Sequence, residues 1–172
     1  LPNTYCIVAI DIEHFRLFNK LYGRSSGDEV IRYIYTCLKQ SALEYDGIDA
    51  YLGGDNFVLV FHKERREKLI EQLQNIRIHH QWQMKEREFV FGATIGVSNL
   101  NGITVPRAIM GRASIAYQAA RQKGVGSVVE FSPEIEQEIL ANQSIVSNFL
   151  PALQAKEFVI YYQPKVNVAD RT

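Results

Sequence analysis

The sequence predicts an α+β fold, in which a central and mostly antiparallel sheet of about five strands carries helices on its faces. Short apolar runs of strand length alternate along the chain with amphipathic stretches of helical spacing. A glycine-rich turn at Gly53–Asn56 lies between two of the apolar runs and predicts a tight hairpin. With 172 residues, 47% of them apolar, the chain can bury a core without covalent staples.

The first part of the chain predicts one strand and two helices before the hairpin. The strand is a nearly continuous apolar run, typical of a buried central strand, and it ends on Asp11. The expected elements are a strand over Tyr5–Ile10, a helix over Glu13–Tyr22 and a second helix capped by Ser25 or Ser26.

The middle of the chain predicts the hairpin and the remaining elements of the sheet. The expected strands cover Ile48–Leu52, Phe57–Phe61, Phe89–Val97 and Val128–Phe131. The expected helices cover Lys63–Ile78, which is charged and amphipathic, and Thr104–Gln122, with Pro106 near its start.

A domain boundary is expected at Ser132-Pro133, which divides the chain into residues 1–131 and 132–172. The second part predicts a helix over Glu134–Leu153 and a strand over Phe158–Tyr162. A strand with nothing after it to cover it indicates the opening of another domain.

The composition indicates which binding partners and which cellular compartment to expect. Lysine plus arginine equals aspartate plus glutamate, at 19 each, so net charge gives no support to binding of nucleic acid, and we expect none. Cys6 and Cys37 lie in apolar runs and are expected to be buried thiols in a reducing cytoplasm. His79 and His80, near the end of an expected helix, are interpreted as solvated. No apolar run approaches the roughly 20 residues of a membrane span, so we expect a cytoplasmic chain, in a full-length protein that can be membrane-attached through upstream segments.

Two carboxylates stand where ligands gather in many α/β folds. Asp55 directly follows Gly53 and Gly54, which lack side chains and allow the backbone to lie close to a ligand. Asp11 ends the first strand. Taken singly, the hairpin can be a plain turn and Asp11 a plain strand end. Together they favour a Mg²⁺ site for phosphoryl transfer, because two carboxylates commonly hold Mg²⁺ against a triphosphate.

Further stretches follow in the order and spacing of one known family. Asp11–Arg16 is similar to the family's D-x-D-x-F-K motif, and Asn19 comes eight residues after Asp11. Gly27-Asp28 follows, Gly53–Phe57 stands in place of a GGDEF signature, and Gly92–Ser98 and Ala113–Gly124 match a later strand and helix. Over roughly residues 5 to 131 the chain therefore resembles the GGDEF family, whose enzymes join two GTP molecules into cyclic di-GMP.

The resemblance implies a role for each matching residue. Asp11 with the carbonyl of Ile12 would hold Mg²⁺, Asp55 would hold it from the other side, and Asp55 with the altered Asn56 would form the catalytic pair. Asn19 and Asp28 would read the guanine edge of GTP, since an amide and a carboxylate can pair with its acceptor and donors. The other implied substrate contacts are Gly53, Gly54, Phe15 and Arg121. The family enzyme works as a homodimer, with two domains face to face.

Several positions depart from the family pattern. Asn56 replaces an acidic residue, so this position carries no charge and cannot act as a base. Such a loss commonly costs about 10²–10³ in rate. Tyr51 replaces an arginine just before the signature. In the late helix Arg121 falls at a lysine position and Val125 at an arginine position, so one phosphate cation is lost; Lys123 is either its substitute or a solvated surface residue.

Two smaller departures concern the early motif and product inhibition. Glu13 replaces an aspartate, and Arg16 replaces a lysine while keeping its charge. The family's inhibitory R-x-x-D motif is replaced by Glu44–Gly47, so a primary inhibitory site for cyclic di-GMP is not expected.

The tail resembles the opening of a second family. Phe158–Lys165, with Leu150–Leu153 and Glu157 before it, looks like the first strand of an EAL domain, the cyclic di-GMP phosphodiesterase. The resemblance implies that Gln163 touches the ligand, while the E-A-L motif and the remaining metal ligands would lie beyond Thr172.

Three functions follow from these residues. The first is a degenerate GGDEF domain that regulates an attached phosphodiesterase and binds GTP weakly or not at all. The second is a slow but active diguanylate cyclase. The third is an interaction module without nucleotide.

Overall fold

The computed structural model of the protein describes residues 4–82, 85–102 and 105–163. The chain forms two compact units, Leu1–Ile139 and Leu140–Thr172. The candidate site lies entirely in the first unit, which contains both sheets and the first four α-helices.

A five-stranded sheet forms the centre of the first unit, in the order β2-β3-β1-β6-β7. Its neighbours are antiparallel except for β6 and β7, which are parallel. The α+β fold with a mostly antiparallel five-stranded sheet is therefore confirmed. The strands are β1 (Tyr5–Ile12), β2 (Ile48–Gly53), β3 (Asn56–His62), β6 (Ala93–Asn99) and β7 (Val128–Glu130).

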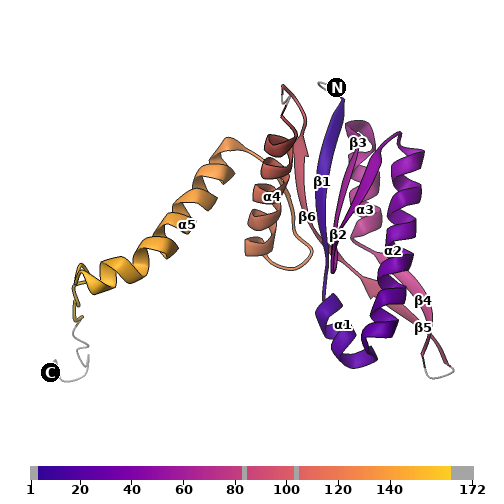
Figure 1. The fold of residues 1–172 in the computed structure, drawn as a ribbon, viewed down its shortest axis with the longest axis horizontal. Coiled ribbons are helices and arrows are strands. Elements are labelled where there is room, and N and C mark those ends of the chain that lie inside the picture. Colours follow the sequence, from indigo (N-terminus) through magenta and orange to yellow (C-terminus); the bar gives the residue numbers. More distant parts are fainter. Residues whose placement is uncertain (1–3, 83–84, 103–104, 164–172) are drawn as a thin grey trace, which may run out of the picture. The chain divides into compact units, whose positions relative to one another are not determined.

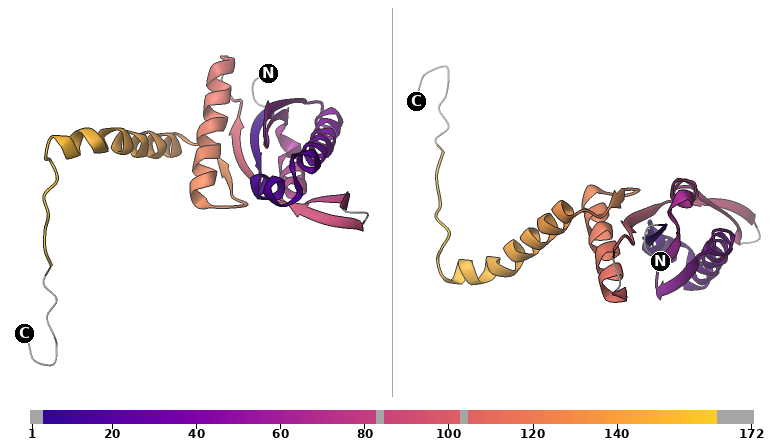
Figure 2. Two further views of the ribbon diagram at one scale, coloured as in Figure 1. Left: turned by 60° about the horizontal axis from the view of Figure 1, so that its bottom comes forward. Right: turned by 90° about the horizontal axis from the view of Figure 1, so that it is seen from above.

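Helices cover both faces of this sheet (Figures 1 and 2). One face carries α1 (Phe15–Tyr22), α2 (Arg24–Glu44) and α3 (Arg66–Leu73), the last preceded by a 3-10 turn over Lys63–Arg65. The other face carries α4 (Pro106–Lys123). Figure 2 shows the sheet between these two groups of helices.

The central strand β1 is buried on both faces, because its side chains alternate between two cores. Val8, Ile10 and Ile12 pack with the first group of helices, whereas Ile7 packs towards α4. Cys6 is fully buried, and burial raises the pKa of its thiol to about 11, so it stays a neutral thiol. The expectation for Cys37 was too strong, since this thiol is only partly buried.

The helix expected over Lys63–Ile78 is wrong in its second half. It ends at Leu73, and β4 (Ile76–Trp82) follows, paired with β5 (Lys85–Phe91) as a separate two-stranded sheet. Ile76 continues the helical spacing of the leucines before it, but Ile76 and Ile78 also alternate as strand residues do. His79 therefore lies on a strand, with its ring nitrogen 3.9 Å from a Glu88 oxygen.

The single strand expected over Phe89–Val97 is in fact two strands that belong to different sheets. Phe91 pairs with Ile76 in the small sheet, whereas Ala93 pairs with Ile12 in the large one. Gly92 lies at the change of sheet, and its carbonyl accepts a hydrogen bond from the Glu13 backbone at 3.0 Å.

Helix α5 (Pro133–Gln154) extends beyond the first unit. Its residues Ile135 and Ile139 pack with Ala119, Ala120 and Val129. Phe158–Tyr162 has no regular secondary structure and is exposed, so the strand expected there is not formed. A single strand without a partner has no ladder to stabilise it. Of the helices in the part of the chain that the structure describes, none has the length and apolar character to cross a membrane.

Candidate functional site

Asp11 and Asp55 meet where β1 runs beside the β2–β3 hairpin. Asp11 lies opposite Asn56 in the ladder between β1 and β3, and the Ile12 backbone donates to the Asp55 carbonyl at 3.0 Å. Burial, and then the negative charge of Asp11, raise the pKa of the Asp55 carboxyl above its usual value. The two carboxylates therefore repel each other, and a cation between them would relieve that repulsion.

A neutral donor holds one oxygen of each carboxylate. The Tyr117 hydroxyl on α4 donates to Asp11 Oδ2. The side-chain amide of Asn56 donates to Asp55 Oδ1 at 3.0 Å. Burial, together with the hydrogen bond to Asp11, raises the pKa of Tyr117, so its phenol stays protonated and remains a donor.

The hairpin tip is built from two glycines in left-handed backbone conformations. Gly53 has φ of 102° and Gly54 has φ of 64°, which other residues adopt only with strain. The Tyr51 hydroxyl donates to the Gly54 carbonyl at 3.1 Å, and its ring lies 5.2 Å from that of Phe57. Tyr51 therefore stabilises the turn.

The two expected guanine readers come from neighbouring helices. Asn19 lies on α1, and the exposed Asp28 lies in the first turns of α2. A Cβ on Gly27 would lie 1.7 Å from Asn19 Oδ1, so only glycine allows this approach. Asn19 Oδ1 is buried without a hydrogen-bond partner among the described residues. An unpaired buried acceptor is costly, and a donor from a ligand would satisfy it.

Phe15 is part of the hydrophobic core beside Gly27. It is 7% exposed, and its ring stacks on that of Phe18 at 6.5 Å. Its ring edge would lie 3.2 Å from a Cβ on Gly27. Its contact with a nucleotide stays a prediction.

A pocket of about 220 Å³ opens beside Asp11 and reaches the end of α4. The charge of Arg121 opposes the rise in the pKa of Asp55, and its guanidinium lies 5.9 Å from the Tyr117 ring centre. Val125, which the sequence comparison above aligns with a family arginine, is 67% exposed and brings no charge. The lining residues are Asp11, Glu13, His14, Thr94, Arg121, Gly124 and Val125.

Glu13 has a structural role that its position in the motif did not reveal. Its carboxylate accepts hydrogen bonds from the Thr94 hydroxyl at 3.1 Å and from the Gly126 backbone. It thereby ties the turn after β1 to β6 and to the loop that carries Val125. Sequence reasoning also missed Tyr117, although Tyr117 and Arg121 are four residues apart on one helix and so share a face.

The donors present suit a hard cation that also binds phosphate. No group of three or more histidine, cysteine, aspartate or glutamate side chains gathers as a metal site within the described ranges. Mg²⁺ typically takes only one or two carboxylates and fills its other positions with water and substrate phosphates. Asp11, Asp55 and the Ile12 carbonyl fit that arrangement.

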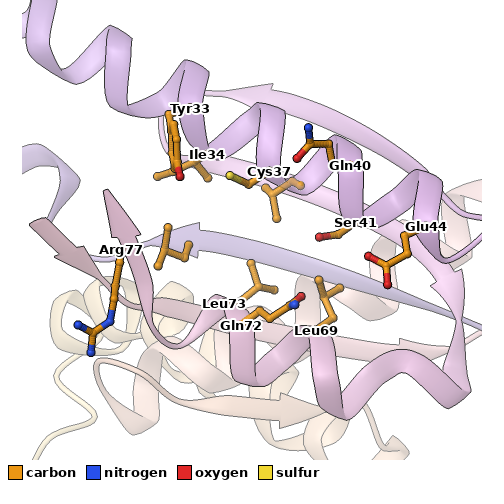
Figure 3. Close-up of a pocket in the computed structure, with 12 residues that line it drawn as sticks. Tyr33, Ile34, Cys37, Gln40, Ser41, Glu44, Leu69, Gln72, Leu73 and Arg77 are labelled. Carbon is orange, nitrogen blue, oxygen red and sulfur yellow. The ribbon is translucent and has the colours of Figure 1, made fainter. Parts of the chain in front are cut away.

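A second pocket, of about 300 Å³, lies between α2 and α3 and contains none of the predicted site residues (Figure 3). Ile34, Leu69 and Leu73 are among its apolar lining residues. Glu44, from the stretch that replaces the inhibitory motif, lines it and pairs with Lys68 at 3.7 Å.

Comparisons with known proteins agree with this geometry. The family model described as "Diguanylate cyclase, GGDEF domain" matches residues 2–127. The cyclic di-GMP phosphodiesterase PdeR of Escherichia coli (strain K12) is 27% identical over 168 residues, which is 95% of this chain and 25% of the relative. The bifunctional diguanylate cyclase/cyclic di-GMP phosphodiesterase MucR of Pseudomonas aeruginosa is also 27% identical over 168 residues, covering 94% of this chain and 24% of that protein. The chain thus spans about a quarter of the length of these relatives.

Solved structures share the fold. The GGDEF domain of DgcB from Caulobacter crescentus, solved in complex with c-di-GMP, superposes with a TM-score of 0.63 at 23% identity, over 74% of this chain and 76% of that one. A Pseudomonas aeruginosa protein (TpbB or YfiN) reduced to its GGDEF domain gives 0.68 at 20% identity, over 80% of this chain and 83% of that one. Since the family model covers most of the chain and the glycine hairpin lies beside Asp11, this chain belongs to the diguanylate cyclase GGDEF-domain family.

Proposed function

We propose that this domain is a degenerate GGDEF domain that binds GTP with Mg²⁺, has lost most of its cyclase activity, and regulates an attached cyclic di-GMP phosphodiesterase. The observation that carries the proposal is the pairing at the hairpin tip. Asn56 stands where active members carry an acid, and its amide donates to the Asp55 carboxylate.

The binding half of the proposal is supported by the residues that remain. Asp11, Asp55 and the Ile12 carbonyl would hold the cation, which when bound neutralises triphosphate charge. Asn19 has an unpaired buried oxygen that suits the N–H donors of guanine, and Asp28 can accept from the same edge. The glycines at the hairpin tip leave room for the nucleotide beside the backbone.

The chemical half is weakened at two positions. Joining two GTP molecules requires removal of a proton from a ribose hydroxyl and stabilisation of charge on the phosphates. Asn56 cannot accept that proton as a carboxylate would, and Val125 adds no cation to the pocket that Arg121 lines. The site therefore suits retention of GTP better than its conversion.

The regulatory half rests on the tail and on the relatives. Phe158–Tyr162 is apolar and exposed, as expected for a strand whose partners belong to an EAL domain. The names of PdeR and MucR both describe a cyclic di-GMP phosphodiesterase. We assign residues 1–131 to the GGDEF domain and 132–172 to the linker helix and the start of the EAL domain, in which Gln163 would meet its ligand.

Calorimetric titration with GTP, with Mg²⁺ and then with EDTA, tests this function. The wild type should bind in both and more tightly with Mg²⁺, and Asp28→Ala should weaken both, since it removes a guanine acceptor. Asp46→Asn, an exposed change outside the site, is the matched control. Equal affinity of Asp28→Ala and the wild type would contradict the site assignment, and a wild type without GTP binding would favour the pure interaction module.

A slow cyclase is the second candidate, and a specific observation favours it. Asp11, Asp55 and Arg121 are still electrostatically coupled, so two domains face to face could still turn over GTP. Incubation with GTP and Mg²⁺ followed by chromatography would show cyclic di-GMP if this candidate is correct.

A further inference from the structure

We infer that Tyr117 is a positioning residue for the cation site: its hydroxyl fixes the Asp11 carboxylate so that Oδ1, the oxygen it does not hold, faces the metal. The inference rests on the proposed function, because it concerns the same Mg²⁺-dependent GTP site. Tyr117, on α4, is not among the residues to which the family resemblance assigns a role.

The phenol is fixed relative to β1 by close packing of backbones. A Cβ on Gly96 would lie 2.2 Å from the Tyr117 nitrogen and 2.7 Å from the Ala113 carbonyl. The helix α4 therefore lies directly on β6 at this glycine. Gly96 pairs in turn with Ala9 on β1, two residues before Asp11, so helix, strand and carboxylate form one rigid set.

The hydrogen bond restricts the carboxylate to one orientation. Tyr117 donates to Oδ2 of Asp11, which opposes rotation of the carboxylate and its bidentate use. Asn56 acts on Asp55 Oδ1 in the same way. Each carboxylate would then offer its other oxygen to the cation and leave further ligand positions to water and phosphates, as is typical of Mg²⁺ sites.

The same helix face carries the remaining cation of the site. Arg121 lies one turn after Tyr117, with its guanidinium 5.9 Å from the phenol ring centre. Arg121 and Asp11 both line the pocket at the end of α4, so the phenol that holds Asp11 and the cation that would meet phosphate lie at one site.

The test compares Tyr117→Phe with the wild type and with Tyr33→Phe. Phenylalanine keeps the ring and removes only the hydroxyl. Tyr33 is a partly exposed tyrosine on α2, outside the site, so its variant controls for loss of a phenol group. Mn²⁺ is titrated into the nucleotide-free protein while the signal of free Mn²⁺ is followed by electron paramagnetic resonance, and GTP is titrated separately in EDTA.

We expect Tyr117→Phe to weaken Mn²⁺ binding by roughly tenfold or more, since partners of metal ligands commonly contribute 10–100-fold. GTP affinity in EDTA should change less than about twofold, because no metal is then involved. Tyr33→Phe should match the wild type in both titrations.

Unchanged Mn²⁺ affinity in Tyr117→Phe overturns the inference, as does a wild type that binds no Mn²⁺. Equal loss of Mn²⁺ and of metal-free GTP binding also overturns it, because that pattern indicates general distortion. A wild type that binds Mn²⁺ but no GTP contradicts the proposed function and leaves the positioning role to be decided by the Mn²⁺ titration of Tyr117→Phe.

Discussion

The two walls of the candidate site differ in the charges that they carry. The carboxylate wall, formed by Asp11, Asp55 and Asn56, keeps two acids, each with a hydrogen-bond donor on one oxygen. The cation wall, formed by Arg121, Gly124 and Val125, keeps one cation and an apolar residue that is 67% exposed.

Under the proposed function, retention of a ligand and its conversion depend on separable groups. A pair of carboxylates would hold the cation, whereas the amide of Asn56 would not take up a proton as an acid does. The loop of the cation wall is held by Glu13, which accepts a hydrogen bond from the Gly126 backbone. The proposed function therefore places the departures from the family pattern in single side chains on an ordered backbone, where single substitutions can test them.

The largest effect is expected from restoring the acid on the carboxylate wall. Asn56→Glu should raise formation of cyclic di-GMP by about 10²–10³, the usual size of one key electrostatic group. Chromatography of the products after incubation with GTP and Mg²⁺ measures it. Asn56→Gln has the same length without the charge, and a similar rise in that variant would mean that charge is not what was lost.

A smaller effect is expected from Gly27, which packs against Asn19, one of the two residues expected to bind guanine. Gly27→Ala places a methyl group against Asn19, so the amide must rotate away, and GTP affinity should fall roughly tenfold with the loss of one buried hydrogen bond. The free energy of unfolding should fall by about 1 kcal/mol, the low end for overpacking. Urea denaturation measures it.

Gly111→Ala is the matched control for that change. Nothing lies within 4 Å of a Cβ at this helical position, so alanine should stabilise the protein by about 0.5–1 kcal/mol. If both alanine variants behave alike, the contact between Gly27 and Asn19 does not constrain the site.

A smaller change in GTP affinity is expected when a positive charge is introduced into the cation wall. Val125→Arg should raise GTP affinity in EDTA about threefold, because an exposed ion pair contributes roughly 0.2–1 kcal/mol. The gain should shrink at high salt, which screens exposed charges. Val125→Gln supplies length without charge, and calorimetry at two salt concentrations separates the two variants.

The smallest effect concerns the burial of Asp55 and its repulsion by Asp11 when no metal is bound. The pKa of Asp55 is raised in the folded protein above its usual 3.8, so its ionisation opposes folding at neutral pH. Asp55→Asn should therefore stabilise the protein at pH 7 in EDTA. This advantage should decline as pH falls through the raised pKa and be absent below about 3.8, where the carboxyl is protonated in both states.

Urea denaturation at pH 7 and at acidic pH checks that sign, with the exposed Asp46→Asn as control. Burial and then the charge of Asp11 raise the pKa of Asp55, whereas a backbone hydrogen bond and the charge of Arg121 lower it. A variant that is less stable than the wild type at pH 7 would mean that the hydrogen bonds of Asp55 and the attraction of Arg121 outweigh its burial and its repulsion by Asp11.

Local patterns predicted much of the frame. The apolar run before Asp11 and the glycine turn specified β1 and the hairpin, since both signals are short-range. The segment after Leu73 and the break at Gly92 could not be predicted from spacing. Ile76 satisfies both a helical and a strand period, and which sheet a strand joins depends on partners far along the chain.

The site shows the same limit. The sequence pointed to Asp11 and Asp55, because carboxylates at strand ends and hairpins are recognisable. It did not point to the hydrogen bond between Tyr117 and Asp11, which joins residues 106 positions apart. Nor could it show that the amide of Asn56 donates to Asp55, since the direction of an amide depends on its neighbours in space.

Ile139 is the last buried residue of α5, and it has a practical consequence for any measurement of assembly. Beyond it the helix carries no charged residue up to Gln154 and exposes Ile145, Val146 and Phe149. Exposed hydrophobic surface of this kind favours non-specific association. A dimer observed with the whole chain can therefore come from the tail, whereas one that persists in residues 1–139 belongs to the nucleotide domain.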